Sequence, residues 1–200
     1  MDYLLTNTNL RPINETFDLI LSDINNKKSL KRMRVLEIGI GNGNCSIPMS
    51  KYFRSYYGIE PLTNIYNVFI ETCNKHNCKI KSYNMDLEEF VNKTTKKFDM
   101  IILRNVIHFI GYDELIRQIK KIIKEDSIII IQNAQANPIG WGNKEFVKDS
   151  INFNEHKWNK FKNKLEECYK SLQNSRYLYR YEQDSKYNFF ILKSNNKFII

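Results

Sequence analysis

The 200-residue chain is poor in the residues that build disulfide frameworks and metal centres, with only four cysteines and three histidines. The cysteines form no repeated pair pattern, so we expect reduced thiols in a cytoplasmic setting. No apolar run approaches a membrane span, and residues 128–131 form only a strand-sized run. The first ten residues lack the basic start and long apolar block of a secretory signal, so we expect neither export nor membrane insertion.

Metal binding is also not expected. Cys73, His76 and Cys78 lie close together in the sequence, but they offer three ligands without a fourth and straddle a helix-to-strand turn. A formal net charge of +9 permits contact with nucleic acid. Most of the basic residues are lysines dispersed among asparagines and isoleucines, which is typical of an AT-rich coding sequence. We therefore give the charge little weight as evidence for a polyanionic partner, and a nucleic-acid partner is not favoured.

Apolar periodicity predicts alternating helices and strands through residue 131. A helical stripe over residues 13–25 precedes the first strand, and Asn44 is a fair N-cap for the second helix. Alternation of this kind predicts an α/β fold with a parallel sheet covered on both faces. Residues 133–153 read as a loop, and Asn154 begins a late helix. Strands are expected at 35–38, 56–59, 78–83, 98–103 and 128–131, helices around 62–69 and 115–123, and an antiparallel pair at 177–181 and 187–192.

The most informative segment is the run from Val35 to Asn44, in which an apolar strand leads into glycines at alternate positions. Such a turn lets a ligand lie against bare main chain and against the N–H groups of the following helix. Dinucleotide-binding folds require G-x-G-x-x-G, which Gly43 and Asn44 do not fit. A merely structural turn is the alternative.

With Glu37 two places before Gly39, the motif E-x-G-x-G-x-G resembles the first motif of the class I S-adenosylmethionine-dependent methyltransferases. The resemblance covers roughly residues 30–194, on element order as well as motifs. It implies a three-layer α/β sandwich with a seven-stranded, mostly parallel sheet whose last strand is antiparallel. We expect one domain over residues 1–200, with an N-terminal helical cap at 1–30 and a substrate-side insertion or lid at 134–172.

The same resemblance implies S-adenosyl-L-methionine as cofactor and S-adenosyl-L-homocysteine as product. Glu60 ends the second strand, where a carboxylate accepts hydrogen bonds from both ribose hydroxyls. Asp86 and Leu87 resemble the adenine site, although an Asp that opens a helix is also an ordinary N-cap. In the family, backbone near Arg104 and Asn105 contacts the methionine part. The residues expected at the glycine turn are Glu37, Gly39, Gly41, Asn42 and Gly43.

His108 follows the fourth strand and is the candidate catalytic residue, since imidazole accepts a proton near neutral pH. The alternative is a histidine that only packs against the turn. Trp141, between two glycines, and His156, at a helix start, are weaker candidates for substrate contact. Trp141 fits a mobile lid. For His156 a solvated position is the alternative.

Motifs of nucleic-acid methylation are missing. No Asn/Asp-Pro-Pro-aromatic motif follows the fourth strand, and no Pro-Cys nucleophile is present where RNA cytosine-C5 enzymes carry one. We therefore predict methyl transfer to a small molecule, with a hydroxyl acceptor such as a sugar or nucleotide-linked sugar favoured over an amine. The alternatives are a nucleic-acid methyltransferase, a small-molecule N-methyltransferase and a non-catalytic binding protein that keeps the fold.

Overall fold

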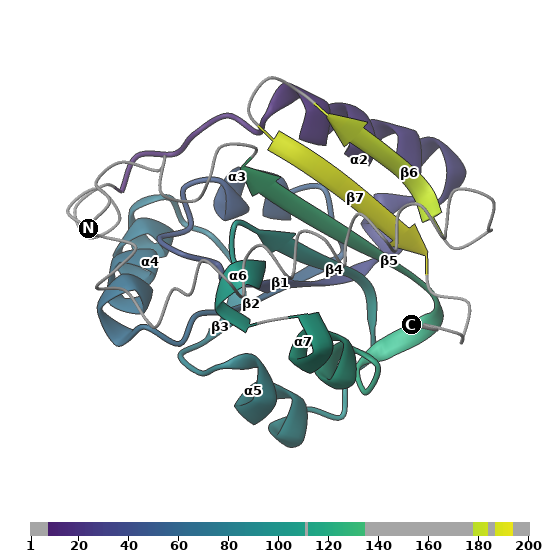
Figure 1. Cartoon of the computed structure of the whole chain (residues 1–200). Helices are drawn as coiled ribbons and strands as arrows, with labels where there is room; N and C mark the ends of the chain where they lie inside the picture. The colour runs from purple at the N-terminus through teal and green to yellow at the C-terminus, as the bar shows by residue number, and fades with distance from the viewer. Residues whose placement is uncertain (1–7, 111, 135–177, 184–186, 194–200) are drawn as a thin grey trace. The chain divides into compact units, whose positions relative to one another are not determined.

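The computed structural model describes residues 8–110, 112–134, 178–183 and 187–193 (Figure 1). The chain divides into two compact units, residues 1–101 and residues 102–200. We describe each unit by itself. No helix among the described residues is long and apolar enough to cross a membrane.

The strands of the first unit are parallel, as the sequence predicts. β1 (Arg34–Ile38) pairs with β2 (Ser55–Ile59), and β2 pairs with β3 (Lys81–Tyr83). Four consecutive residues are buried at the end of both β1 and β2. Since neighbouring side chains of a strand point to opposite faces, both faces of this sheet are covered.

Helices follow each of these strands. The helix α2 (Glu15–Lys27) precedes them, begins at the N-cap Asn14, and buries Phe17, Ile20, Leu21 and Ile24 in the predicted stripe. The prediction of Asn44 as a helix N-cap is wrong, because the cap residue of α3 is Cys45 and no side chain bonds there. The remaining helices of this unit are η1 (Leu30–Arg32), α3 (Ser46–Ser50), α4 (Thr63–Lys75) and α5 (Leu87–Lys93).

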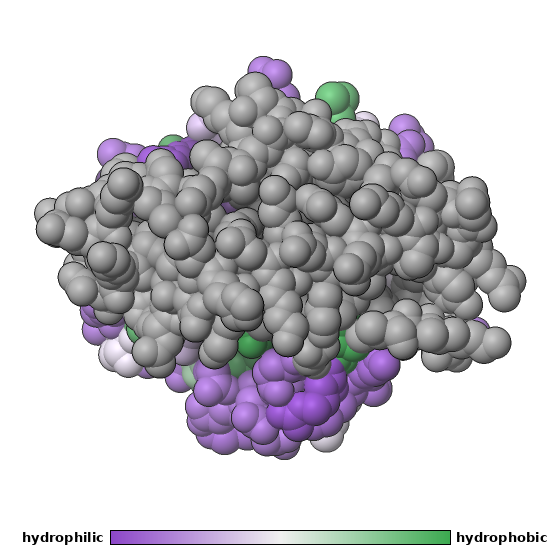
Figure 2. Space-filling view, viewed as in Figure 1, coloured by the Kyte–Doolittle hydropathy of each residue, from purple (hydrophilic) through white to green (hydrophobic). Residues whose placement is uncertain are grey.

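The face of α5 that reaches solvent is polar. In Figure 2, hydrophilic side chains gather on the lower edge, where Figure 1 places α5. The inward face carries Leu87, Phe90 and Val91, all buried. This division is the pattern of an amphipathic helix lying on a core.

The strand β4 (Phe98–Arg104) begins in the first unit and ends in the second. In the second unit, β5 (Ile123–Ala134) pairs antiparallel with β7 (Tyr187–Lys193), and β7 pairs antiparallel with β6 (Leu178–Gln183). The predicted antiparallel pair near the C-terminus is thus confirmed (Figure 1). Two helices, α6 (Ile107–Ile110) and α7 (Tyr112–Ile119), lie between β4 and β5.

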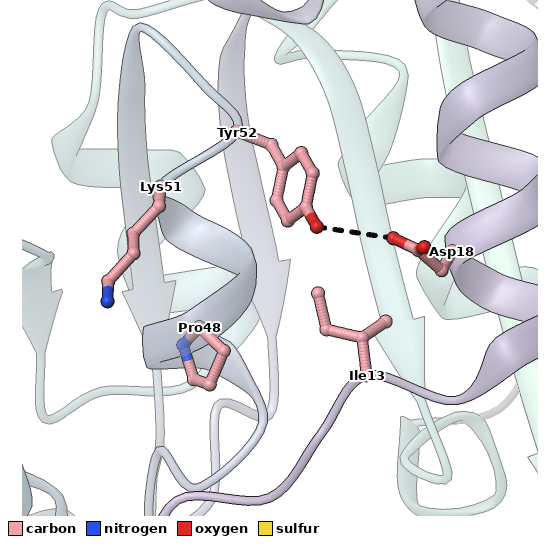
Figure 3. Close-up of a pocket in the computed structure, with 5 residues that line it drawn as sticks. All are labelled: Ile13, Asp18, Pro48, Lys51 and Tyr52. Atoms are coloured by element: carbon pink, nitrogen blue, oxygen red, sulfur yellow. Dashed lines mark hydrogen bonds between the residues drawn. The ribbon is translucent and has the colours of Figure 1, made fainter.

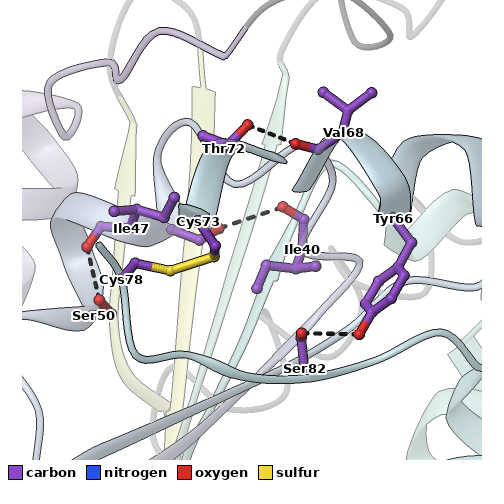
Figure 4. The surroundings of a disulfide bond; sticks show 10 residues. Ile40, Ile47, Ser50, Tyr66, Val68, Thr72, Cys73, Cys78 and Ser82 are labelled. Carbon is purple, nitrogen blue, oxygen red and sulfur yellow. Dashed lines mark hydrogen bonds between the residues drawn. A yellow bond between two sulfur atoms is a disulfide. The ribbon is translucent and has the colours of Figure 1, made fainter. Parts of the chain in front are cut away.

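The cysteines differ from expectation. Cys73, in α4, and Cys78 form a disulfide, so the expectation of reduced thiols is wrong for this pair (Figure 4). The helix ends one turn before Cys78, whose N–H donates to the carbonyl of Cys73 at 3.0 Å. Composition gave no sign of this pairing, because it depends on where the helix ends. Cys45 remains a thiol, and the described residues hold no group of ligands suited to a metal ion.

Candidate cofactor-binding site

The glycine-rich turn follows β1 directly and has the geometry that only glycine adopts easily. Gly39, Gly41 and Gly43 have φ of 72°, 60° and 80°. The left-handed region is costly for other L-residues. The N–H groups of Gly39 and Ile40 both donate to the Ile59 carbonyl at 3.0 Å, which holds the turn against the end of β2.

The glycines differ in what surrounds them. A Cβ placed on Gly43 would lie 2.7 Å from the Phe69 ring of α4, so this glycine lets helix and turn pack closely. A Cβ on Gly41 would meet no heavy atom within 4 Å. The main chain at Gly41 therefore borders open space, which is what a ligand lying against it requires.

Glu60, the first residue after β2, stands beside this open position. Its two carboxylate oxygens accept N–H groups from Gly41 at 3.1 Å and from Leu62 at 3.2 Å. Burial raises the pKa of the carboxyl, the two N–H donors oppose that rise, and the nearby Glu37 adds to it. The result is a fixed acceptor with unused lone pairs at the edge of the glycine turn.

Asn84 holds the chain around Glu60 in place, a role that sequence reasoning missed. Its amide nitrogen donates to the Glu60 carbonyl at 2.8 Å and to the Pro61 carbonyl at 3.2 Å. The Thr63 hydroxyl donates to the amide oxygen at 2.8 Å. No local pattern announces such a residue, because its partners lie more than twenty positions away.

Glu37 lies inside the protein rather than at the open space. Its side chain is fully buried, and the Tyr56 hydroxyl donates to it at 2.7 Å. A buried carboxylate needs such donors to offset its lost hydration. The contact joins β1 to β2 beneath the glycine turn.

Asn42 and Asn44 close the turn. The Asn44 N–H donates to the Asn42 side-chain oxygen at 3.4 Å, and both residues are buried. The Asn44 carbonyl accepts the Arg11 N–H at 3.0 Å, which brings the segment before α2 across the turn. The same segment contacts the end of α4, where Lys75 donates to the Thr8 hydroxyl at 3.1 Å. Sequence analysis did not foresee this crossing.

Asp86 is the N-cap of α5, and its carboxylate accepts the Glu89 N–H at 2.8 Å. The capping alternative is therefore confirmed, and Asp86 is exposed. One carboxylate can cap a helix and still accept from a ligand. Leu87 is buried and starts the helix.

The second unit carries the remaining candidates. Arg104 ends β4, and Asn105 has a φ of 54° with its N–H bonded to the Gln132 carbonyl at 2.8 Å. A left-handed Asn turns the chain sharply after the strand. His108 lies in α6, but its side chain is outside the description. Trp141, His156 and the rest of residues 135–177 lie outside the described residues.

An α/β unit with parallel strands, a left-handed glycine turn after β1 and an acid after β2 defines a Rossmann-like domain that binds a nucleoside cofactor. Residues 11–185 match the family Methyltransf_23, described as a methyltransferase domain. The chain belongs to this family, within the class I S-adenosylmethionine-dependent methyltransferases.

Two curated relatives are ubiquinone biosynthesis O-methyltransferases. The chain is 27% identical over 139 residues to the one from Pelagibacter ubique, covering 67% of this chain and 57% of that protein. It is 25% identical over 146 residues to the mitochondrial one from Bos taurus, covering 67% and 38%. The match thus spans about half or less of the length of these relatives.

Solved structures share the fold. The magnesium protoporphyrin IX methyltransferase of Synechocystis PCC 6803, solved with bound SAH, has a TM-score of 0.60 at 14% identity, with 96% of this chain and 92% of that one covered. A putative S-adenosyl-L-methionine-dependent methyltransferase from Methanococcus maripaludis has a TM-score of 0.59 at 19% identity, with 91% and 86% covered.

Proposed function

We propose that this protein transfers a methyl group from S-adenosyl-L-methionine to a hydroxyl of a small molecule. The open main chain at Gly41 beside the fixed carboxylate of Glu60 is the observation that carries the cofactor half of the proposal. The residues fit the group: bare backbone for close approach, and a fixed carboxylate acceptor for a pair of ribose hydroxyls. When bound, the cofactor supplies an activated methyl on a sulfonium.

We propose the following roles for residues of the first unit, which the methyltransferase resemblance implies and the hydrogen bonds of Glu60 support. Glu60 would accept from both ribose hydroxyls, while the Gly41 and Leu62 N–H groups keep its carboxylate oriented. Asp86 and the Leu87 N–H would hold the adenine, and carbonyls near Gly39 would accept from the ammonium group. Asn42 and Gly43 shape the turn, and Glu37 positions β1 through Tyr56.

In the second unit, main chain near Arg104 and Asn105 would contact the methionine part. We propose that His108 acts as the base that takes the proton of the acceptor hydroxyl, since alignment of the nucleophile and removal of its proton are what a methyltransferase adds. Trp141 and His156, in the proposed lid at 134–172, would face the acceptor.

We further propose that the seven strands form one mostly parallel sheet with an antiparallel last strand, in a single domain whose residues 1–30 cap it. The likeness to solved methyltransferase structures, which covers 91–96% of this chain, supports this. A cytoplasmic location is a separate proposal, and the Cys73–Cys78 disulfide removes the argument from reduced thiols that the cysteine pattern gave for it.

A hydroxyl acceptor is supported by the two O-methyltransferases among the relatives. An amine acceptor would need no base, so His108→Ala would leave turnover intact. Sugars and nucleotide-linked sugars are the acceptors to screen first.

Calorimetric titration with S-adenosylhomocysteine tests the cofactor half. We expect binding to the wild type and a loss of about tenfold or more for Glu60→Ala, because a charge-assisted bidentate contact is removed. An exposed carboxylate elsewhere on the first unit, Glu71→Ala, is the matched control. No heat with the wild type would refute the proposal.

A labelled methyl donor with a metabolite panel tests the acceptor half. We expect label on a hydroxyl compound, and a pH-dependent loss of turnover in His108→Ala with cofactor affinity kept. Label on an amine compound, or turnover in the variant equal to wild type, would contradict O-methylation with His108 as base.

A further inference from the structure

We propose that the first unit binds a single-stranded nucleic acid along the edge where its parallel strands begin, away from the glycine turn. The site is an amino-edge cluster made of Lys31, Arg32, Lys51, Arg54, Lys96 and Lys97, with Tyr52 beside it. The nucleic acid bound there is a docking partner and not the methyl acceptor. The argument uses only residues of the first unit and does not depend on the proposed function.

Hydrogen bonds bring the cluster together from three separate segments. The Lys31 ammonium donates to the Lys51 carbonyl, and the Arg54 N–H donates to the Met33 carbonyl at 3.2 Å. Arg34, at the start of β1, donates from its guanidinium to the Lys97 carbonyl at 3.2 Å. The segments before β1, β2 and β4 are thus neighbours at one edge.

The cluster is exposed and has few counter-charges. All six of its basic residues are exposed. Among the residues that the structure describes, no carboxylate forms an ion pair with Arg32, Arg54 or Lys96. Asp99 lies at this edge, and its carboxylate accepts the main-chain N–H of Arg34 at 2.9 Å. Like charges gathered on one edge destabilise the fold and raise the local potential for an anionic partner.

The arrangement favours a strand of phosphates over a flat membrane. The strands of the sheet lie about 4.8 Å apart, so residues at successive strand starts form a row. A row of cations follows a polynucleotide backbone, whereas attraction to an anionic membrane surface needs clustered cations in no particular arrangement. Tyr52, an exposed aromatic residue, directly follows Lys51 in the cluster, and an aromatic ring beside cations is the stacking platform of single-strand binders.

Tyr52 also lines a cavity of about 370 Å³ together with Ile13, Asp18, Pro48 and Lys51 (Figure 3). Its hydroxyl donates to Asp18 at 3.3 Å, and the negative charge of Asp18 raises the pKa of the phenol, so the ring stays neutral. The residues that line this cavity thus offer an aromatic face, a carboxylate acceptor and a cation, which are groups that contact a base and its phosphate. Asp18 itself repels phosphate, so the phosphates belong over the lysines and arginines.

The edge is distinct from the cofactor site. The basic residues precede β1, β2 and β4, and the glycine turn follows β1, with the five residues of that strand between it and Lys31 and Arg32. At about 3.3 Å per residue the two ends are about 16 Å apart. A strand docked at the amino edge therefore leaves the glycine turn open, and S-adenosylhomocysteine should not compete with it.

The test is fluorescence anisotropy with labelled oligouridylate and oligothymidylate of about 16 nucleotides. With four phosphates neutralised, the logarithm of affinity should fall against the logarithm of salt with a slope of about −3, or about 50-fold between 0.05 and 0.2 M salt. The full-length variant with Arg32, Lys51, Arg54 and Lys96 changed to Gln should lose this binding. A matched control removes four charges elsewhere, with Lys93, Arg117, Lys120 and Lys121 changed to Gln, and should keep it.

Substitutions of Tyr52 distinguish the contribution of base stacking to affinity from the contribution of charge. Tyr52→Ala should weaken binding about fivefold or more, while Tyr52→Phe, which keeps the ring, should not. Both four-charge variants should give the circular dichroism spectrum of the wild type, which shows that they fold whether or not the proposed function holds. Equal affinity of the two four-charge variants would overturn the proposal. Tighter binding to phosphatidylglycerol vesicles than to either oligonucleotide, or transfer of labelled methyl to the oligonucleotide, would overturn it as well.

Discussion

Two alanine substitutions in the glycine turn should differ in what they impair more: Gly43→Ala should lose more stability, and Gly41→Ala should lose more cofactor affinity. Gly41 and Gly43 both have left-handed φ, so an alanine at either position costs about 1–2 kcal/mol of stability from backbone strain. At Gly41 nothing else is added, because the new methyl group meets open space. At Gly43 the methyl would lie 2.7 Å from the fully buried ring of Phe69. Overpacking of this kind costs a further 1–3 kcal/mol, for a total of about 2–5 kcal/mol.

Cofactor affinity should change in the reverse order. The methyl of Gly41→Ala projects into the space beside Glu60 where we place the cofactor, and affinity for S-adenosylhomocysteine should fall at least about tenfold, or about 1.4 kcal/mol. The methyl of Gly43→Ala points into the core toward α4, so the folded fraction of that variant should lose less affinity.

Urea unfolding followed by circular dichroism measures the first effect, and calorimetric titration measures the second. A double-mutant cycle with Phe69→Ala adds a check: removal of the ring should relieve the clash, so that the two losses sum to more than the loss of the double variant. Equal destabilisation by the two alanines would refute the packing argument. Unchanged affinity in Gly41→Ala would refute the placement of the cofactor.

Three further perturbations test the surroundings of the turn. Because burial raises the pKa of Glu60, the affinity of the wild type for S-adenosylhomocysteine should fall as pH drops through a value above the ordinary range of a glutamate. Calorimetry on Glu60→Gln should show weak binding without that pH dependence. A wild-type affinity that stays constant from neutral pH down to the usual glutamate pKa would contradict this. Replacement of Cys73 and Cys78 by Ser should lower the free energy of unfolding by about 2 kcal/mol, because the disulfide closes a short loop. Thermal denaturation should show a Tm lower by about 4–8 °C, and dithiothreitol should lower the Tm of the wild type by the same amount. A dithiothreitol effect in the double variant would contradict this. Tyr56→Phe should lower the free energy of unfolding in urea by about 2 kcal/mol, since it removes a hydrogen-bond donor from the buried carboxylate of Glu37. An unchanged urea midpoint would show that this hydrogen bond does not stabilise the fold.

The local parts of the site are readable from sequence because short-range backbone geometry dictates them. A strand that leads into alternating glycines predicts a tight turn, and the structure has that turn, with positive φ at Gly39, Gly41 and Gly43. The stripe of α2 was predicted for the same reason, since apolar spacing alone selects the buried face. Rules of this kind depend on only a few neighbouring residues.

The expectations that failed required knowledge of where an element ends. Asn44 has the right side chain for a helix cap, but α3 starts two residues later, and tertiary burial of Asn44 prevails over its capping preference. The Cys73–Cys78 pair exists because α4 stops at Lys75 and the chain folds back at once. Helix boundaries are the least certain part of any sequence pattern.

Contacts between distant segments could not be predicted from the sequence, for a different reason. Asn84 supports the chain at Glu60 from beyond β3, and Arg11 crosses the glycine turn from before α2. Neither residue stands in a pattern, because a hydrogen bond to a main-chain carbonyl places no demand on the sequence near its donor. Such residues are found only when the fold has placed them.

The charge distribution of the first unit follows from its topology. In a parallel sheet every strand starts at one edge and ends at the other, so residues just before strands and residues just after them are sorted to opposite edges. Here Arg32, Arg54 and Lys96 precede β1, β2 and β4, while Glu60 follows β2 and Asp86 comes soon after β3. The chain as a whole appears only diffusely basic, with lysines scattered along it. Sorted by strand direction, the same residues give a cationic edge and an acidic edge, so an anionic chain bound at the first would not compete with a nucleoside bound at the second.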